Sequence, residues 1–488
     1  MFLRRIMIVI MLLPVIMINA KSQFIEDALR YSQPNGLISA RSAGLGIAYL
    51  GLADDYSALF FNPAGLSLIT KTELNVGMGF QRNANTIKFE HVTSEFKAND
   101  AYFSHAGLVA PFKTGMGNAA IGLGYVLESN YNNTYEYNGF NRNNTMTANQ
   151  AKYGTRNYEN NWAYHLWLAN QDLYTPIVDS LYQNVYVTEK GGLHDVLGGV
   201  AFDVGPSVSV GLNIIGKFGS YDYVRNYSEQ DVYNKYNEFD TLTWKNLDFN
   251  ALYVDETINQ DIFGITGSLG LQARISEFMR LGVTVKFPTY YQIDEEYGVY
   301  AHSKFDDGWE PNPYDPAEPA RISYKITSPF IYSAGISFQA EGLVFAAGVE
   351  YLDATQLSFS DANGDEVTNI DEIRRYFDRL NQDITRELVG QVTWGFGVEW
   401  DIPAVPIIVR GSFQSTTSPY SVDVPGASNN VLALGGGVYL AANMRLDAVF
   451  RWSSLTQIRT NYGSAENGSL YEQTLKPFNI GLQYTVRF

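Results

Sequence analysis

The sequence predicts an all-β fold: a 14-stranded antiparallel transmembrane β-barrel with an N-terminal hatch, or plug, and long extracellular loops. Of the 488 residues, 45% are hydrophobic, 14% aromatic and only 17% charged, which is typical of a folded chain. The 34 Tyr and 28 Phe favour pleated, half-buried strands. Apolar and polar residues alternate over many segments, and the connections between these segments alternate between short and long.

Net charge and cysteine content exclude several classes of function. Lys and Arg total 34 against 51 Asp and Glu, so the formal net charge is −17 and the chain repels phosphate backbones. We therefore expect no nucleic-acid partner. The absence of cysteine from the sequence excludes disulfide frameworks, thiolate metal sites and cysteine nucleophiles.

The first twenty residues are typical of a secretory signal peptide. Arg4 and Arg5 precede the apolar run 6–18, and Ala20 ends a plausible cleavage site. This run is shorter than the ~17 to 25 residues that a transmembrane helix needs. No later stretch reaches about 18 consecutive apolar residues, so helical membrane spans are not expected. An exported, β-rich chain is then either a soluble protein or a barrel in an outer membrane.

Residues 21–70 come before the first predicted strand and do not alternate. They contain the Gly-rich stretch 41–49, the acidic pair Asp54–Asp55 and the motif Asn62-Pro63-Ala64. Proline fixes φ and favours an extended preceding residue, so Asn62-Pro63 also fits a simple turn. A barrel of this size is too wide to be filled by the side chains of its own wall, so we expect this segment to be the plug.

The remaining residues, 71–488, are predicted to form the barrel. Alternation is clearest from Phe478 to Phe488, and ending on an aromatic residue resembles the signal by which the barrel assembly machinery recognises outer-membrane barrels. The predicted strands are 71–82, 101–112, 119–131, 194–205, 207–221, 262–275, 279–292, 321–339, 343–356, 388–401, 404–416, 430–441, 444–458 and 476–488.

Connection lengths favour a membrane barrel over a soluble propeller or sandwich. The short connections include 113–118, 205–206, 276–278 and residue 403, whereas the long connections that alternate with the short ones run from 417–429 up to 132–193. Transmembrane barrels have short periplasmic turns and longer outer loops, and soluble β folds do not sort their turns in this way. Both termini are therefore placed in the periplasm.

The segment 41–66 resembles the FadL-like family of outer-membrane transporters for long-chain fatty acids and hydrocarbons. Three features of this segment match the hatch of that family: the Gly-rich stretch, the Ala-Asp-Asp sequence, and the motif Asn62, Pro63 and Ala64. Weaker matches occur at 348–351 and 416–420. The resemblance implies that outer loops capture a hydrophobic small molecule, which diffuses passively past a gated hatch. It also implies sideways release into outer-membrane lipid through a kinked third strand, where alternation places Gly122 and Gly124 on the inward face.

Four cationic residues are candidates for binding the head of an amphipathic ligand. A fatty acid needs mostly apolar walls and one or two cationic donors for its carboxylate. The alternation within each predicted strand places Lys217, Lys286, Arg410 and Arg451 on the side facing the lumen. Whether these residues share one height in the barrel does not follow from the sequence.

One outer loop has the spacing of a calcium-binding loop, and we expect no other cofactor. Oxygen ligands fall at positions 1, 3, 5, 9 and 12 of the window 361–372, and the backbone of the seventh residue supplies another. The candidate ligands are Asp361, Asn363, Asp365, Val367, Asn369 and Glu372. Glu366 stands where the loop requires Gly, so an acidic turn before a helix is the alternative. Residues 370–388 have the apolar spacing of that helix.

Catalysis is not expected. The five histidines are scattered, and the sequence contains no G-x-S-x-G or H-E-x-x-H motif. Two alternatives to a transporter remain. One is an accessory barrel of type IX secretion, related to the same family, which would bind a protein through its long loops. The other is an outer-membrane enzyme such as a phospholipase, which the missing Ser/His constellation disfavours.

Overall fold

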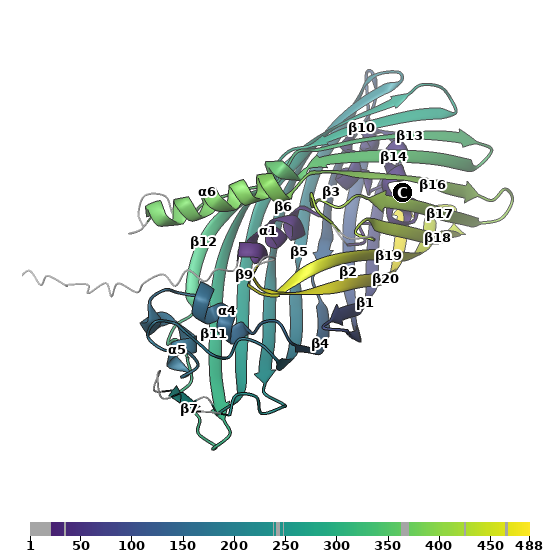
Figure 1. The fold of residues 1–488 in the computed structure, drawn as a ribbon. Helices are drawn as coiled ribbons and strands as arrows, with labels where there is room; N and C mark the ends of the chain where they lie inside the picture. The colour runs from purple at the N-terminus through teal and green to yellow at the C-terminus, as the bar shows by residue number, and fades with distance from the viewer. Residues whose placement is uncertain are drawn as a thin grey trace, which may run out of the picture.

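A computed structural model gives the fold of the chain (Figure 1). It describes residues 21–33, 36–237, 239–240, 245–246, 248–362, 370–423, 426–463 and 467–488. The predicted signal peptide at 1–20 lies outside these residues. None of the helices in the described ranges has the length and apolar character that crossing a bilayer would require.

A closed barrel of 14 antiparallel strands forms the body of the protein. Strand β20 pairs with β1 from Glu73↔Arg487 to Lys88↔Glu472, which closes the wall and leaves no sheet edge at this position. The wall strands are β1 (Glu73–Phe89), β2 (Val92–Thr114), β3 (Gly117–Asn130), β5 (Leu181–Gly205), β6 (Val208–Gln230), β9 (Phe249–Arg274), β10 (Met279–Lys286), β13 (Ile331–Ala340), β14 (Leu343–Asp353), β16 (Gly390–Asp401), β17 (Ile407–Thr416), β18 (Asn429–Ala441), β19 (Met444–Tyr462) and β20 (Ser469–Arg487).

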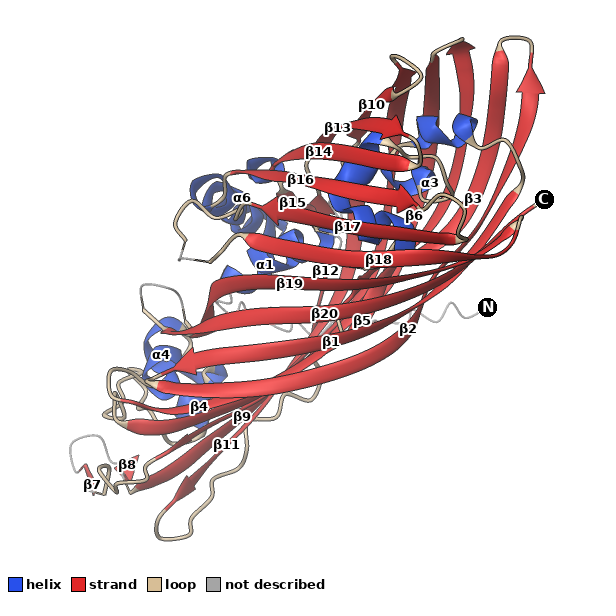
Figure 2. Cartoon of the chain, turned by 90° about the vertical axis from the view of Figure 1, so that its right-hand side faces the viewer, coloured by secondary structure: helices blue, strands red, loops and turns tan. Residues whose placement is uncertain are grey.

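Four further strands continue the wall toward its outer end. They are β4 (Asn133–Asn141), β11 (Tyr290–Phe305), β12 (Ala320–Thr327) and β15 (Ser358–Asp361). Pro288 separates β10 from β11 and Pro329 separates β12 from β13, because proline lacks the N–H that a ladder needs. A short hairpin, β7 (Phe239–Asp240) with β8 (Lys245–Asn246), lies near the same end (Figure 2).

All fourteen predicted strands are present, and several run further than the sequence indicated. The connection expected at 83–100 is mostly strand: β1 and β2 meet at Glu90 and His91, whose φ values are 42° and 68°. Left-handed residues suit a two-residue hairpin. The polar residues of this stretch, such as Asn83 and Asn85, hid the strand extension, whose inward face also carries the buried Ile87 and Phe89.

The outward face of the wall carries an apolar belt. Large side chains such as Phe103, Leu108, Leu123, Val200 and Phe263 are each more than 40% exposed. A soluble protein rarely exposes so much contiguous apolar surface, and a belt of this kind on a closed barrel is typical of outer-membrane proteins. The protein is therefore an outer-membrane β-barrel.

The N-terminal segment, residues 21–70, folds into short helices that lie inside the barrel (Figure 1). Its core side chains, including Leu45, Tyr49, Tyr56 and Leu59, pack with inward-facing wall residues such as Val109. Its elements are α1 (Lys21–Ser32), α2 (Ala40–Leu45), η1 (Gly46–Gly51), α3 (Ala58–Phe61) and η2 (Pro63–Leu68).

Loops at the outer end form two packed groups. The first joins α4 (Met146–Tyr153) and α5 (Trp162–His165) to the tall strands β4, β5, β9 and β11 through a shared apolar core, and η3 (Tyr158–Asn160) lies between the two helices in the chain. In the second, η4 (Ala354–Gln356) precedes β15, and α6 (Ile370–Glu387) packs Phe377, Leu380 and Ile384 beside residues of α1. The periodicity of 370–388 thus correctly predicted this helix.

Candidate functional site

A cavity of about 490 Å³ lies within the barrel between the outer loops and the N-terminal segment. Tyr420, Asp423 and Arg459 line it where the outer loops meet β19. Phe60 and Phe61 of α3 line its deeper part. A volume of this size is typical of small-molecule sites.

The wall beside the cavity has a break in its ladder, which we call the seam. Strands β2 and β3 pair from Thr114↔Gly117 only as far as His105↔Val126. Beyond that point β2 continues along β1 up to Val92, and β4 continues along β5. A bulge between Leu127 and Ser129 turns β3 away from β2 at the point where pairing ends.

Polar side chains bridge the seam. The Asp100 carboxylate on β2 accepts hydrogen bonds from the amides of Asn130 and Asn132, at 2.7 and 2.8 Å. Asn83 of β1 donates to the backbone oxygen of Asn132 at 2.9 Å. Asn130 and Asn83 also line the cavity, so the cavity reaches the seam. The seam is therefore held by a few hydrogen bonds from asparagine side chains instead of a continuous backbone ladder.

The N-terminal segment contacts both strands of the seam. Gly36 donates its backbone N–H to the oxygen of Glu128, beside the bulge, at 2.8 Å. The Tyr56 hydroxyl reaches the backbone oxygens of Ala106 and Tyr125, which face each other one pair below the end of the ladder. Tyr56 thus supports the last paired step of the wall.

Gly122 and Gly124, predicted to mark a bend, instead make room for the N-terminal segment. A Cβ on Gly124 would lie 2.3 Å from the Tyr56 hydroxyl, and one on Gly122 would lie 3.3 Å from Leu59. Both glycines face inward, as their position in the alternation indicated. The bulge itself comes three residues after Gly124.

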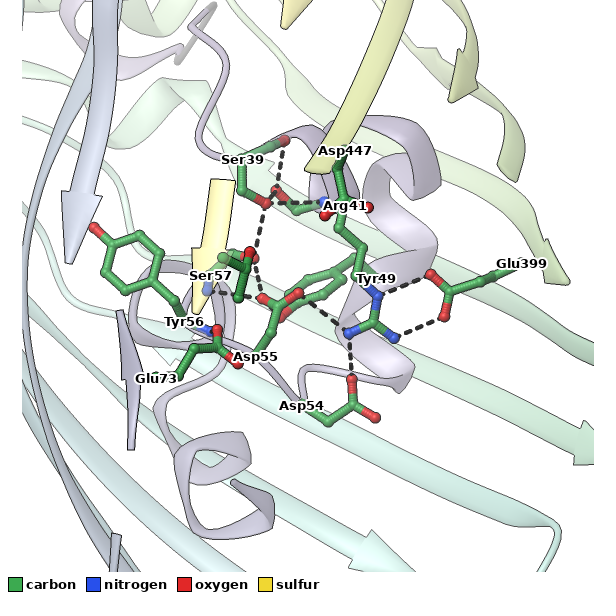
Figure 3. A network of polar contacts seen from close by, with 12 residues as sticks. Ser39, Arg41, Tyr49, Asp54, Asp55, Tyr56, Ser57, Glu73, Glu399 and Asp447 are labelled. Atoms are coloured by element: carbon green, nitrogen blue, oxygen red, sulfur yellow. Dashed lines mark hydrogen bonds and ion pairs between the residues drawn. The ribbon is translucent and has the colours of Figure 1, made fainter. Parts of the chain in front are cut away.

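A buried ionic network joins the N-terminal segment to the opposite wall (Figure 3). Arg41 of α2 makes a bidentate pair with Glu399 of β16, at 2.8 Å for each bond, and also contacts Asp54 and Asp55. Glu399 and Asp447 in turn hold Arg410, at 2.5 and 2.6 Å. Two parallel N–H···O bonds fix the geometry of a guanidinium as well as its charge.

Asp55 is held in its charged form. Burial disfavours the ionised carboxylate, but Arg41 and hydrogen bonds from Ser57 and Tyr49 outweigh it, so the pKa of Asp55 lies below its usual range. The Tyr49 hydroxyl donates to Asp55 at 2.7 Å. Asp55 is therefore charged at neutral pH, and removing Arg41 would leave it as an unpaired buried charge.

The Asn62-Pro63-Ala64 motif ties the same segment to β9. Asn62 caps the turn by accepting the N–H of Ala64 at 3.2 Å. Its amide also donates to the Leu271 backbone oxygen and to Gln272, both at 3.1 Å. Ala64 packs close to Gly211 and Gly270, where a Cβ would clash with the motif. The residues Asn62-Pro63-Ala64, which resemble the hatch motif, therefore also form the simple turn that the sequence suggested.

The four predicted ligand-binding cations face inward but differ in their pairing. Lys217 is fully buried between Glu128 and Asp195, and Arg410 between Glu399 and Asp447. These two cations are already neutralised and do not line the cavity. Alternation predicted their direction, but the pairing partners come from other strands and could not be read from the sequence.

Lys286 and Arg451 line the cavity. The Lys286 ammonium lies 3.5 Å from Glu128, which it shares with Lys217, and 5.2 Å from the centre of the Phe60 ring. Arg451 has no carboxylate partner in the part of the chain that the structure describes. A negatively charged ligand can reach both cations from the cavity.

The predicted calcium loop falls largely outside the described residues. Asp361 ends β15, whereas Asn363, Asp365, Val367 and Asn369 lie outside the described ranges, and so does the side chain of Glu372. Among the described residues, no group of three or more His, Asp or Glu side chains is arranged to hold a metal ion. Calcium binding stays a prediction.

Comparison with solved structures identifies related folds. A FadL homologue from Pseudomonas aeruginosa superimposes with a TM-score of 0.57 at 14% sequence identity, covering 92% of this chain and 98% of the homologue. The toluene transporter TodX from P. putida superimposes with a TM-score of 0.52 at 11% identity, covering 93% and 99%. The fold implied by the resemblance of residues 41–66 is thus confirmed. No family model matches the sequence, and no curated protein sequence matches it.

Proposed function

We propose that this protein is an outer-membrane channel through which hydrophobic small molecules, such as long-chain fatty acids, diffuse passively into the membrane. The observation that carries the proposal is the position of the cavity. It is lined at one end by residues of the outer loops and at the other by Asn130 and Tyr131 at the seam. A molecule in the cavity is therefore next to the break in the ladder between β2 and β3.

The fold comparison supports the class of cargo. Two barrels with the same architecture are described as a FadL homologue and as a toluene transporter. Fold similarity alone does not determine function, so the argument depends on the cavity and its lining. That lining combines apolar residues such as Leu29, Phe60 and Ile331 with the cations Lys286 and Arg451. This combination suits an amphipathic acid.

In this proposal the N-terminal segment acts as the hatch. It fills the lumen, and the Arg41 network anchors it to β16, so direct passage to the periplasm is blocked. The Tyr56 and Gly36 contacts place the other side of the segment against the seam. Movement of Gly36 and Asn132 would then open the seam toward the lipid. The contact between Arg41 and β16 would stay intact, so the path to the periplasm would remain blocked.

The experiment compares two neighbouring tryptophan substitutions on β10. Thr284 lines the cavity, whereas Val283 faces the lipid. Cells that lack their own fatty-acid channel would express the protein, and uptake of radiolabelled oleate would be measured. Thr284→Trp should reduce uptake at least fivefold, because the indole fills the cavity, and Val283→Trp should not. Equal uptake by both variants would contradict the proposed function.

A further inference from the structure

A row of inward-facing polar residues crosses the wall at the side of the cavity. Arg451 of β19 lies opposite Asn479 of β20, which lies opposite Gln81 of β1. Neighbouring strands are about 4.8 Å apart, so these side chains form a continuous strip. All three residues line the cavity. We call Arg451, Asn479 and Gln81, together with Tyr102 of β2, the polar row.

The polar row contains buried atoms that lack hydrogen-bond partners. They are the Gln81 Oε1, the Asn479 Oδ1 and the Tyr102 hydroxyl, none of which has a partner among the residues that the structure describes. Gln81 has a fixed orientation, because its Nε2 donates to Asn83 Oδ1 at 3.0 Å. The Tyr102 ring lies across Gly79, where a Cβ would come within 2.5 Å of it. Burying a polar atom without a hydrogen-bond partner is unfavourable, so three such atoms on neighbouring strands point to a ligand.

The charge of the polar row changes from one end to the other. Arg451 is the cationic end. Beyond Gln81 comes Asp100, directly opposite it on β2, whose carboxylate already accepts from Asn130 and Asn132. An acid group would therefore be drawn to the Arg451 end, and hydrogen-bond donors to the Gln81 end.

We propose that the polar row binds the head group of an amphiphile that carries an acid beside a hydrogen-bond donor, such as a hydroxylated fatty acid or an N-acyl amino acid. The inference rests on the proposed function, because the tail of this ligand occupies the same cavity. The acid pairs with Arg451. A hydroxyl or an amide N–H donates to Asn479 Oδ1 or Gln81 Oε1. The carboxylate of an unsubstituted fatty acid pairs with Arg451 but gives no hydrogen-bond donor to Asn479 Oδ1 or Gln81 Oε1.

The test uses three probes with the same chain length: 3-hydroxydodecanoate, dodecanoate and dodecan-1-ol. Binding to the purified full-length protein in lipid nanodiscs would be measured by titration calorimetry, with empty nanodiscs subtracted. We expect 3-hydroxydodecanoate to bind at least fivefold more tightly than dodecanoate. Equal affinity for the two acids would overturn the inference and leave the proposed function standing. Failure of all three probes to bind would contradict both.

Variants assign the effect to the polar row. Arg451→Met should weaken both acids at least tenfold, and Lys325→Met, which removes an exposed charge on β12, is the matched control. Gln81→Leu and the milder Tyr102→Phe should each reduce the ratio of the two acid affinities toward one. If Arg451→Met affects the acids no more than Lys325→Met does, the polar row is not the head-group site.

Discussion

At the residue scale, Arg41 joins the N-terminal segment to the wall through a buried ionic contact with β16. It pairs with Glu399 on β16 and with Asp54 and Asp55 beside it in the chain. The sequence indicated the importance of segment 41–66 through its motifs. It gave no sign that Glu399 is the partner, because that contact joins residues 358 positions apart.

Replacing Arg41 tests this anchor. In Arg41→Met, Glu399 and Asp55 lose a buried partner, and breaking such a pair typically costs about 3–5 kcal/mol. We expect the N-terminal segment to loosen and ion conductance across planar bilayers to rise at least tenfold. Arg280→Met is the matched control, since Arg280 pairs with Asp54 at 2.9 Å and is partly exposed. Conductance that rises equally in both variants would contradict the anchor.

Acidification should release the same anchor. The folded pKa of Asp55 is depressed, so its contribution to stability is present above its unfolded pKa of about 3.9 and is lost as pH falls toward the folded pKa. Conductance should therefore stay low from pH 7 to about 4 and increase below that. Bilayer recordings over a pH series measure this. An increase already complete by pH 5 would show that another group controls release.

At the scale of elements, Tyr56 and a pair of glycines determine how the N-terminal segment meets the wall. Gly107 and Gly124 lie opposite each other on β2 and β3, and the Tyr56 ring rests on both. Alternation correctly placed Gly124 on the inner face. The sequence could not show that the space left by the missing side chains belongs to a tyrosine of another element.

A single methyl group at Gly107 should disturb this contact. A Cβ there would lie 1.6 Å from the Tyr56 ring, so Gly107→Ala forces the ring out of place. We expect faster proteolysis of residues 33–60 in the assembled barrel. Gly216→Ala is the control, because nothing lies within 4 Å of a Cβ at that glycine of β6. Identical digestion rates for the two variants would show that the packing of Tyr56 does not hold the segment.

At the scale of the whole molecule, the sequence predicted the barrel well and its seam poorly. The number of strands follows from the alternation of apolar and polar residues with a period of two. The direction of the strands follows from the alternation of short and long connections. The seam depends on where β2 and β3 stop pairing, and on a bulge that leaves no mark in the alternation of 119–131. The side chains that bridge it, Asp100 and Asn130, belong to stretches that look like ordinary polar loop ends.

The most direct test of the central claim is to lock the seam. The chain has no cysteine, so Asp100→Cys with Asn130→Cys introduces the only two thiols, and a short cleavable bifunctional reagent joins them. Leu108→Cys with Leu123→Cys, opposite each other below the seam, is the control pair. If cargo leaves through the seam, cross-linking the first pair should reduce oleate uptake at least tenfold, cleavage should restore it, and the control pair should be unaffected. Undiminished uptake through a fully cross-linked seam would contradict lateral exit.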